Sequence, residues 1–335
     1  MNKILIIDPG KGWGQFVSKM YCYQKLSEHL DSKIIFLTKK STQAEYYLGS
    51  TSFCEKVIYL EEPKKGIKNI FKNIKFFLKN IEKINQFNFN VCYVFHPSLR
   101  YLFIAIFSNI KNIWGLGFKF QSLLLKRDQK YYQSFFSKSK GDDETLESVK
   151  KITHYLNIDY KPLSSLDYGL RDTVGIIIAA SGNEKRWSIN NYLKVIDFLK
   201  EKNYKKFLII SGLDQSYDEK LIKDNFTDNL ELIFTSDKKI NEVIPFLKKC
   251  KFCIGNDTGF AHLSVNLDIE TLIIHGDCPP QSYSKLLKHV DIEPDVTRSP
   301  TSIHTIKIEK VLDELSKLLN RRGGRVVEGA RLESV

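Results

Sequence analysis

The stretch CKFCIGNDTGFAHLSVNLDIETLIIHGD, residues 250–277, contains one complete strand–turn–helix–strand pattern. A short apolar run at 252–254 breaks into a glycine-flanked turn at 255–259. A helix-like segment and a second apolar run follow. The turn places Asp257 and Thr258 directly after a predicted strand, so these two side chains are the first candidates for a function.

The rest of the chain repeats this alternation of strand and helix signals. Apolar runs predict strands in two series, at 3–8, 33–38, 56–60, 91–95 and 112–117, and then at 174–180, 206–211 and 230–235 before the opening stretch. Helical patterns lie between them, at 16–30, 64–85, 101–107, 144–157, 189–202, 216–225, 240–250 and 305–319. Alternating strands and helices favour parallel sheets covered on both faces. We therefore expect an α/β protein with two Rossmann-like domains, at 1–165 and 166–320, and a disordered tail at 321–335.

Bulk composition narrows the class of protein. The chain has 335 residues, 42% of them hydrophobic, and a formal net charge of +12. No apolar run is long enough to span a membrane, and the N-terminus lacks the pattern of a signal peptide. We expect a cytoplasmic protein with reduced cysteines. The positive charge favours an anionic partner, namely nucleic acid, a membrane surface or an acidic substrate. No nucleic-acid-binding motif is recognisable, so we expect no nucleic-acid partner.

Cys250 and Cys253 form the one closely spaced cysteine pair. A zinc site needs two further ligands at compatible spacing, and no second paired motif exists. We expect no metal site and place both thiols in the hydrophobic core.

The turn at 255–259 combines features that suit a nucleotide sugar. The start of a helix offers free backbone N–H groups and a positive dipole end, which attract a phosphate. Thr258 can donate its hydroxyl to that phosphate, or it can simply cap the helix. Asp257 would repel a phosphate but is a strong acceptor for a sugar hydroxyl. His262, one helical turn later, can point at the same site, or it can be an ordinary buried histidine.

A second candidate lies at 179–199, where a predicted strand ends in a Ser181-Gly182 turn. The following loop carries Lys185 and Arg186, and Ser188 is a plausible N-cap of the next helix. Two cations between a turn and a helix start suit a pyrophosphate. The alternative is a solvated pair of surface cations.

Together these two stretches resemble glycosyltransferase family 9, the lipopolysaccharide heptosyltransferases. The family signature, a strand followed by Asn-Asp-Ser/Thr-Gly-x-x-His, is NDTGFAH at 256–262. The family's upstream turn followed by Lys-Arg/His-Trp is matched by Ser181 and by KRW at 185–187. Weaker similarity extends over residues 3–319.

The resemblance implies a glycosyltransferase-B fold and an inverting, metal-independent transfer that needs no cofactor. The implied donor is ADP-heptose, and the implied acceptor is an anionic glycolipid such as a lipopolysaccharide core or another bacterial surface glycan. The donor-binding residues that it implies are Ser181, Lys185, Arg186, Asp257, Thr258, Gly259 and His262. In this picture Lys185 and Thr258 contact the diphosphate, and Asp257 holds the sugar.

The first loop departs from the family pattern. The family loop ends in Gly-Asp, and that Asp is the proposed general base, but this chain has Gly14-Gln15 there. A glutamine cannot accept a proton. We predict instead that Asp8, at the end of the first strand, is the catalytic base, with His96 as the second candidate. The alternative for Asp8 is a turn-stabilising residue before Pro9.

A basic amphipathic helix is predicted at 64–84. Lys68, Lys72, Lys75 and Lys79 would form one face, and Ile67, Ile70, Phe71, Ile74, Phe77, Leu78 and Ile81 the other. Such a helix can rest on an anionic membrane, so we expect peripheral association with the inner membrane. The alternative is an ordinary helix packed on the first sheet.

Two other functions are compatible with the predicted pair of Rossmann-like domains. The first is a catalytically inactive nucleotide-sugar-binding homologue, which the missing loop Asp favours. The second is an oxidoreductase on two Rossmann domains, which the incomplete glycine fingerprint at 10–14 disfavours.

Overall fold

The computed structural model divides the chain into two compact units, Met1–Pro162 and Leu163–Val335. The structure describes residues 3–10, 12–49, 51–61, 70–96, 98–117, 119–124, 130–133, 171–226 and 230–332. The predicted domain boundary after residue 165 and the predicted helix at 144–157 lie outside the described residues.

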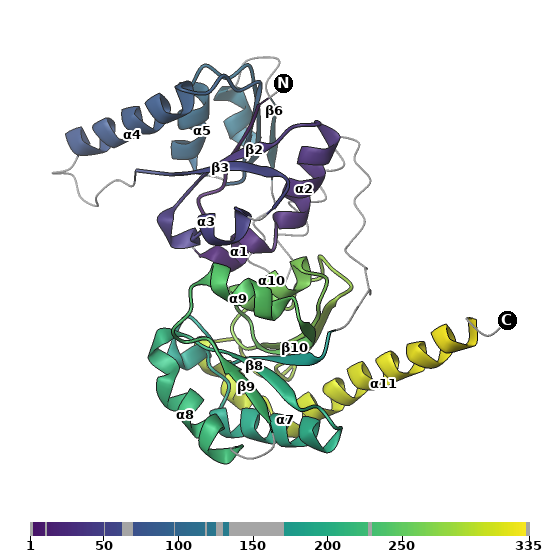
Figure 1. Ribbon diagram of the computed structural model, residues 1–335. Helices are drawn as coiled ribbons and strands as arrows, with labels where there is room; N and C mark the ends of the chain where they lie inside the picture. Colours follow the sequence, from purple (N-terminus) through teal and green to yellow (C-terminus); the bar gives the residue numbers. More distant parts are fainter. Residues whose placement is uncertain are drawn as a thin grey trace. The chain divides into compact units, whose positions relative to one another are not determined.

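The first unit contains a six-stranded parallel sheet in the order β3-β2-β1-β4-β5-β6. Figure 1 labels β2, β3 and β6 of this sheet together with helices α1 to α5. Its strands are β1 (Ile4–Ile7), β2 (Ile34–Thr38), β3 (Cys54–Tyr59), β4 (Val91–Val94), β5 (Asn112–Gly117) and β6 (Lys130–Gln133). The connecting helices are α1 (Trp13–Val17), α2 (Met20–His29), α3 (Glu45–Leu48), α4 (Ile70–Asn85) and α5 (Leu99–Ile106). Every residue of β1 and β2 is buried, as expected for inner strands covered on both faces.

The second unit also contains a six-stranded parallel sheet, in the order β12-β11-β10-β7-β8-β9. Its strands are β7 (Thr173–Ile177), β8 (Lys206–Ile210), β9 (Glu231–Phe234), β10 (Cys250–Asn256), β11 (Glu270–His275) and β12 (Leu287–Asp291). Its α-helices are α7 (Ile189–Glu201), α8 (Ser216–Asn225), α9 (Ile240–Leu247), α10 (Gly259–Asn266) and α11 (Ile308–Leu332). Two parallel-sheet α/β units confirm the predicted fold class.

Strand order in the second unit gathers the candidate loops. β10 pairs with β7 on one side and with β11 on the other. Because the strands are parallel, the loops that follow these three strands leave the same edge of the sheet. These are the loops at 178–188, 257–258 and 276–286.

Trp187, the last residue of the KRW stretch, is a core residue. Its indole is buried, lies edge-on to Tyr192 with ring centroids 5.2 Å apart, and donates a hydrogen bond of 2.9 Å to the carbonyl of Ile306. A buried indole with a satisfied N–H is a stable anchor. It fixes the loop that carries Lys185 and Arg186 to the body of the unit.

Two strands of the structure are missing from the sequence prediction. β6 and β12 are both edge strands, and β12 (LKHVD) buries only Leu287 and Val290. Edge strands need little apolar surface, so their sequences carry a weak periodicity signal. The last helix also differs from the prediction, because α11 continues to Leu332 where we expected disorder from 321.

The orientation of α4 differs from the predicted one. Ile74 and Leu78 are 50% and 58% exposed, although the sequence places both on the packed face. The reason is Asn80, which is buried and exchanges two hydrogen bonds, of 2.9 and 3.0 Å, with the backbone of Glu61. Turning Asn80 inward leaves Ile74 and Leu78 beside the exposed Lys75 and Lys79.

The cysteines are free thiols, and Cys250 and Cys253 are buried within β10 as expected. A Cβ at Gly175 on the neighbouring strand would lie 2.5 Å from the Cys253 sulfur, so the glycine makes room for this side chain. Within the described ranges, no group of three or more His, Cys, Asp or Glu side chains is arranged to hold a metal ion.

Candidate functional site

Asn256, the last residue of β10, braces the candidate site. Its carboxamide oxygen accepts hydrogen bonds from the backbone N–H of Trp187 (3.1 Å) and from the hydroxyl of Tyr192 (2.8 Å). Its NH₂ group donates to the carbonyls of Ile178 (2.8 Å) and Ala179 (3.3 Å). These four contacts use the full bonding capacity of a carboxamide. The Asn of the NDTGFAH motif therefore ties β10 to the end of β7 and to the KRW loop, and does not face a ligand.

The two glycines next to the site serve packing. A Cβ at Gly255 would lie 2.1 Å from the carbonyl oxygen of Ile177, and one at Gly276 would lie 2.7 Å from the Cβ of Ile303. Neither position tolerates a side chain in this arrangement. Gly255 thus lets β7 approach β10 closely.

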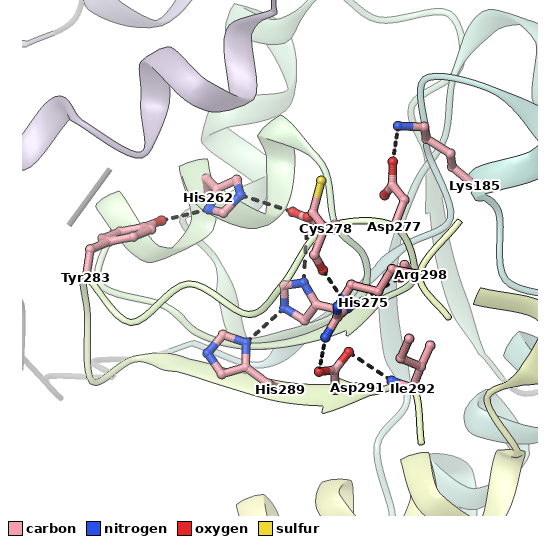
Figure 2. A network of polar contacts seen from close by, with 12 residues as sticks. Lys185, His262, His275, Asp277, Cys278, Tyr283, His289, Asp291, Ile292 and Arg298 are labelled. Carbon is pink, nitrogen blue, oxygen red and sulfur yellow. Dashed lines mark hydrogen bonds and ion pairs between the residues drawn. The ribbon is translucent and has the colours of Figure 1, made fainter. Parts of the chain in front are cut away.

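Asp257 lies between two histidines, His262 and His275, whose rings are labelled in Figure 2. Its Oδ1 is 3.1 Å from Nε2 of His262, and its Oδ2 is 3.6 Å from Nδ1 of His275. Burial alone would raise the pKa of the Asp257 carboxyl, but hydrogen bonds and positive charge from the two histidines outweigh burial and hold that pKa well below its usual range. Asp257 is therefore an ionised acceptor at neutral pH.

The network continues outward from both histidines. Nδ1 of His262 lies 2.8 Å from the hydroxyl of Tyr283, and Nε2 of His275 lies 2.9 Å from Nδ1 of His289. Burial, together with the neighbouring His275, lowers the pKa of His289 to about 4, so this ring is neutral at pH 7. Both ring nitrogens of His262 are engaged. We therefore expect His262 to position Asp257 and not to contact a ligand directly.

Thr258 occupies the N-cap position of α10, but its side chain makes no capping hydrogen bond. Its hydroxyl oxygen is buried and has no hydrogen-bond partner among the described residues. Buried hydroxyls are nearly always paired, so an orphaned one next to free helix N–H groups indicates a place for a ligand oxygen. Gly259, the first residue of α10, contributes one of those N–H groups.

Lys185 and Arg186 both form ion pairs within the unit. The ammonium of Lys185 binds the carboxylate of Asp277, and this hydrogen bond raises the pKa of Lys185. The guanidinium of Arg186 lies 2.5 Å from the carboxylate of Asp214. Ser181, in the turn before them, is exposed. These residues follow β7 and lie at the same sheet edge as Asp257 and Thr258.

Asp8 directly follows β1 in the first unit and is buried. Its carboxylate accepts hydrogen bonds from the ammonium of Lys19 and from the hydroxyl of Tyr23. Burial, and then the charge of Asp8, raise the pKa of Tyr23 well above its usual value, so the phenol stays protonated and donates. A cation and a phenol therefore share the carboxylate that we predicted to be the base.

His96 follows β4, the neighbour of β1 in the sheet. Its Nδ1 accepts a hydrogen bond of 3.0 Å from the backbone N–H of Ser98, and its ring lies edge-on to Tyr101. In the neutral imidazole this contact leaves Nε2 as the N–H donor. The choice of base between Asp8 and His96 stays a prediction.

Four residues of the network lie outside the sequence-predicted site: His275, Asp277, Tyr283 and His289. The available signal was the position of His275 and Asp277 at the carboxyl end of a predicted strand, where ligands bind in parallel sheets. Tyr283 and His289 carry no comparable signal.

Two parallel-sheet α/β units, with the candidate loops at one sheet edge of the second, have the architecture of the glycosyltransferase-B fold. Solved structures that share the fold include the following three. The glycosyl transferase family 9 from Veillonella parvula DSM 2008 is 13% identical, with 96% of this chain and 97% of that chain covered and a TM-score of 0.70. E. coli heptosyltransferase WaaC with ADP is 13% identical, with 94% and 99% of the two chains covered and a TM-score of 0.69. E. coli ADP-heptose lps heptosyltransferase II is 16% identical, with 96% and 99% of the two chains covered and a TM-score of 0.63.

The family model of glycosyltransferase family 9 (heptosyltransferase) matches residues 125–299, which is more than half of the chain. The chain belongs to this family and is a glycosyltransferase. A search of curated protein sequences found no match. Family membership confirms the resemblance inferred from the two motifs and removes the oxidoreductase alternative.

Proposed function

We propose that this protein transfers a heptose, or a related sugar, from an ADP-sugar to a bacterial surface glycan such as a lipopolysaccharide core. The proposal rests on two adjacent groups at the start of α10. Asp257 is ionised, and the buried hydroxyl of Thr258 has no hydrogen-bond partner among the described residues. One group suits a sugar hydroxyl and the other a phosphate oxygen. Two structural relatives are named as an ADP complex and as an ADP-heptose enzyme, which supports the choice of donor.

In the proposed reaction an acceptor hydroxyl attacks the anomeric carbon from the face opposite the diphosphate. The new glycosidic bond forms as the bond from the anomeric carbon to the diphosphate oxygen breaks. The hydroxyl proton passes to a general base, for which we propose Asp8 first and His96 second. ADP leaves with the bonding electrons, and Lys185, Thr258 and the N–H groups of α10 stabilise its charge. This route uses neither a metal nor a cofactor.

Asp257 is assigned to the sugar because its charge is unsuited to the diphosphate. Its two histidine neighbours keep the carboxylate ionised and fixed. A fixed acceptor can select a sugar by the direction of one hydroxyl. Ser181 and Arg186 are proposed as further diphosphate contacts, on the strength of the family motif and their position after β7.

The test is a transfer assay with ADP-heptose and a heptose-free lipopolysaccharide core, read by mass. Gain of one heptose unit with release of ADP supports the proposal. Binding of ADP-heptose without any transfer would support the inactive homologue instead, the alternative that Gln15 favours. The same assay on Thr258→Val separates transfer at this site from a contaminating activity.

We also propose that the enzyme works at the cytoplasmic face of the inner membrane, where a glycolipid acceptor lies. None of the described helices is long and apolar enough to cross a bilayer. The exposed Ile74 and Leu78 of α4 lie beside Lys75 and Lys79. Phe107, which follows α5 and is 62% exposed, contacts Phe77 of α4. Apolar side chains among lysines suit an anionic interface.

A further inference from the structure

The two cations of the KRW stretch, Lys185 and Arg186, are held by different kinds of carboxylate. Asp214, the partner of Arg186, is 68% exposed. Asp277 and Lys185 are only 24% and 34% exposed. Water screens exposed pairs most strongly, so Lys185–Asp277 is the tighter of the two pairs.

Asp277 is held in place by the residues on either side of it. Gly276 packs closely against Ile303. The guanidinium of Arg298 donates to the carbonyls of Gly276 (3.4 Å) and Cys278 (3.1 Å), and it pairs with Asp291 (Figure 2). The loop is thus anchored immediately before and after Asp277. The backbone at Asp277 is therefore fixed, and its carboxylate is held next to Lys185.

We propose that Asp277 is an internal counter-ion, which the diphosphate of the donor must displace from Lys185. The inference rests on the proposed function, because it takes Lys185 as a diphosphate ligand. A diphosphate and a carboxylate are both anions, so they compete for one ammonium and repel each other when they share it. Asp277 therefore lowers the affinity of the site for nucleoside diphosphates and speeds the release of the ADP product.

The counter-ion also protects the empty site. An unpaired, partly buried lysine would attract inorganic phosphate from the cell. With Asp277 in place, only a ligand that makes several contacts at once, with Thr258, the helix N–H groups and Asp257, gains enough to displace it. The pair thus favours a complete nucleotide sugar over inorganic phosphate.

The test is titration calorimetry of the full-length protein with ADP, for the wild type and for Asp277→Asn. We expect the variant to bind ADP about tenfold more tightly, because one competing charge is gone. The affinity for inorganic phosphate should rise by a larger factor than the affinity for ADP, so the ratio of the two affinities should shrink. Asp313→Asn is the matched control, since it removes the same charge from an ion pair with Lys317 on α11. Its ADP affinity should stay within twofold.

A double-mutant cycle with Lys185→Ala separates competition from a merely structural role. If Asp277 occupies Lys185, the loss of ADP affinity caused by Lys185→Ala is larger in the Asp277→Asn background than in the wild type. Equal losses, or weaker ADP binding by Asp277→Asn, would overturn the counter-ion. If the wild type binds none of ADP, GDP and UDP, the proposed function falls together with this inference, and that result is distinct from the first two. Asp277→Ser gives the same expectation with a different side chain.

Discussion

Nε2 of His262 lies 3.1 Å from Oδ1 of Asp257, so the first turn of α10 holds the carboxylate that precedes it. The same ring meets Tyr283 on its other side. The ring that holds Asp257 is thus itself held by a residue of the loop after β11. This geometry fixes the carboxylate for which we propose a sugar-binding role.

We predict that His262→Ala lowers kcat/KM with ADP-heptose about 10- to 100-fold, as expected for loss of a charged hydrogen bond. ADP affinity should stay within threefold, because ADP lacks the sugar. Tyr283→Phe, which removes only the outer contact, should cost less. An equal loss of ADP and ADP-heptose affinity in His262→Ala would place His262 on the nucleotide instead.

Thr258→Val tests the orphaned hydroxyl. The substitution keeps the shape of the side chain and removes a buried polar group without a partner, so the unliganded protein should gain up to about 1 kcal/mol of unfolding free energy. ADP affinity should fall about tenfold. Thr235→Val is the matched control, because the Thr235 hydroxyl accepts a hydrogen bond from the backbone N–H of Ser211. That control should lose stability and keep ADP affinity. A stability loss in Thr258→Val would contradict our assignment.

Stability should fall between about pH 6.5 and pH 4 because of His289. Its folded pKa is about 4, below the value of 6.5 for a free histidine, so the unfolded chain binds its proton first. The stabilisation is complete above pH 6.5 and is lost as the pH falls through 4. Denaturant unfolding at pH 7 and pH 5 should show a smaller difference for His289→Gln than for the wild type. An unchanged difference would mean that other groups set this pH dependence. Asp257 adds a further loss below about pH 4, since its pKa is lowered.

Asp8→Asn tests the general base. If Asp8 accepts the proton, turnover should fall about 100-fold or more while donor affinity changes by only a few fold. The substitution also leaves the Lys19 ammonium without its carboxylate, so the melting temperature should fall. Lys19→Gln breaks the same ion pair and keeps Asp8, which shows how much activity the loss of the pair alone removes. Near-normal turnover in Asp8→Asn would move the role to His96.

Membrane association can be measured by co-sedimentation with vesicles that contain anionic lipid. We predict binding that weakens as salt rises from low to high, since lysines near anionic lipid are screened. Replacing both Ile74 and Leu78 by Ser should weaken binding at least about tenfold through lost apolar burial. Leu213→Ser, an exposed leucine of the second unit, is the control. Binding that ignores salt and both α4 residues would count against the proposal.

Central parts of the fold are readable from the sequence because their periodicity has one explanation. The runs of β1, β2 and β7 are mostly apolar and completely buried, as expected for inner strands of a parallel sheet, and Gly255 and Gly259 flank the turn at the end of β10. The seven predicted donor-site residues follow β7 and β10, two strands that pair directly. Local pattern and parallel topology together are enough to place such loops at one edge.

The rest of the site depends on register, which local patterns do not encode. His275 and His289 touch because β12 pairs with β11 in a register that places Asp291 opposite His275. The sequence of β12 gives no clear strand signal, so the contact between His275 and His289 could not be predicted. The Lys185–Asp277 pair joins residues from two loops far apart in the chain. The exposed face of α4 was mispredicted because one buried asparagine, Asn80, outweighed the apolar pattern.

The fourfold hydrogen bonding of Asn256 has a thermodynamic consequence for ligand binding. Because this side chain holds the KRW loop to two strands before any ligand arrives, the loop is ordered when the protein folds. Binding of a donor next to this loop therefore costs the protein little conformational entropy. Calorimetry should therefore show ADP binding with a small unfavourable entropy, whereas Asn256→Ala should make the entropy of binding more unfavourable even where the enthalpy is kept.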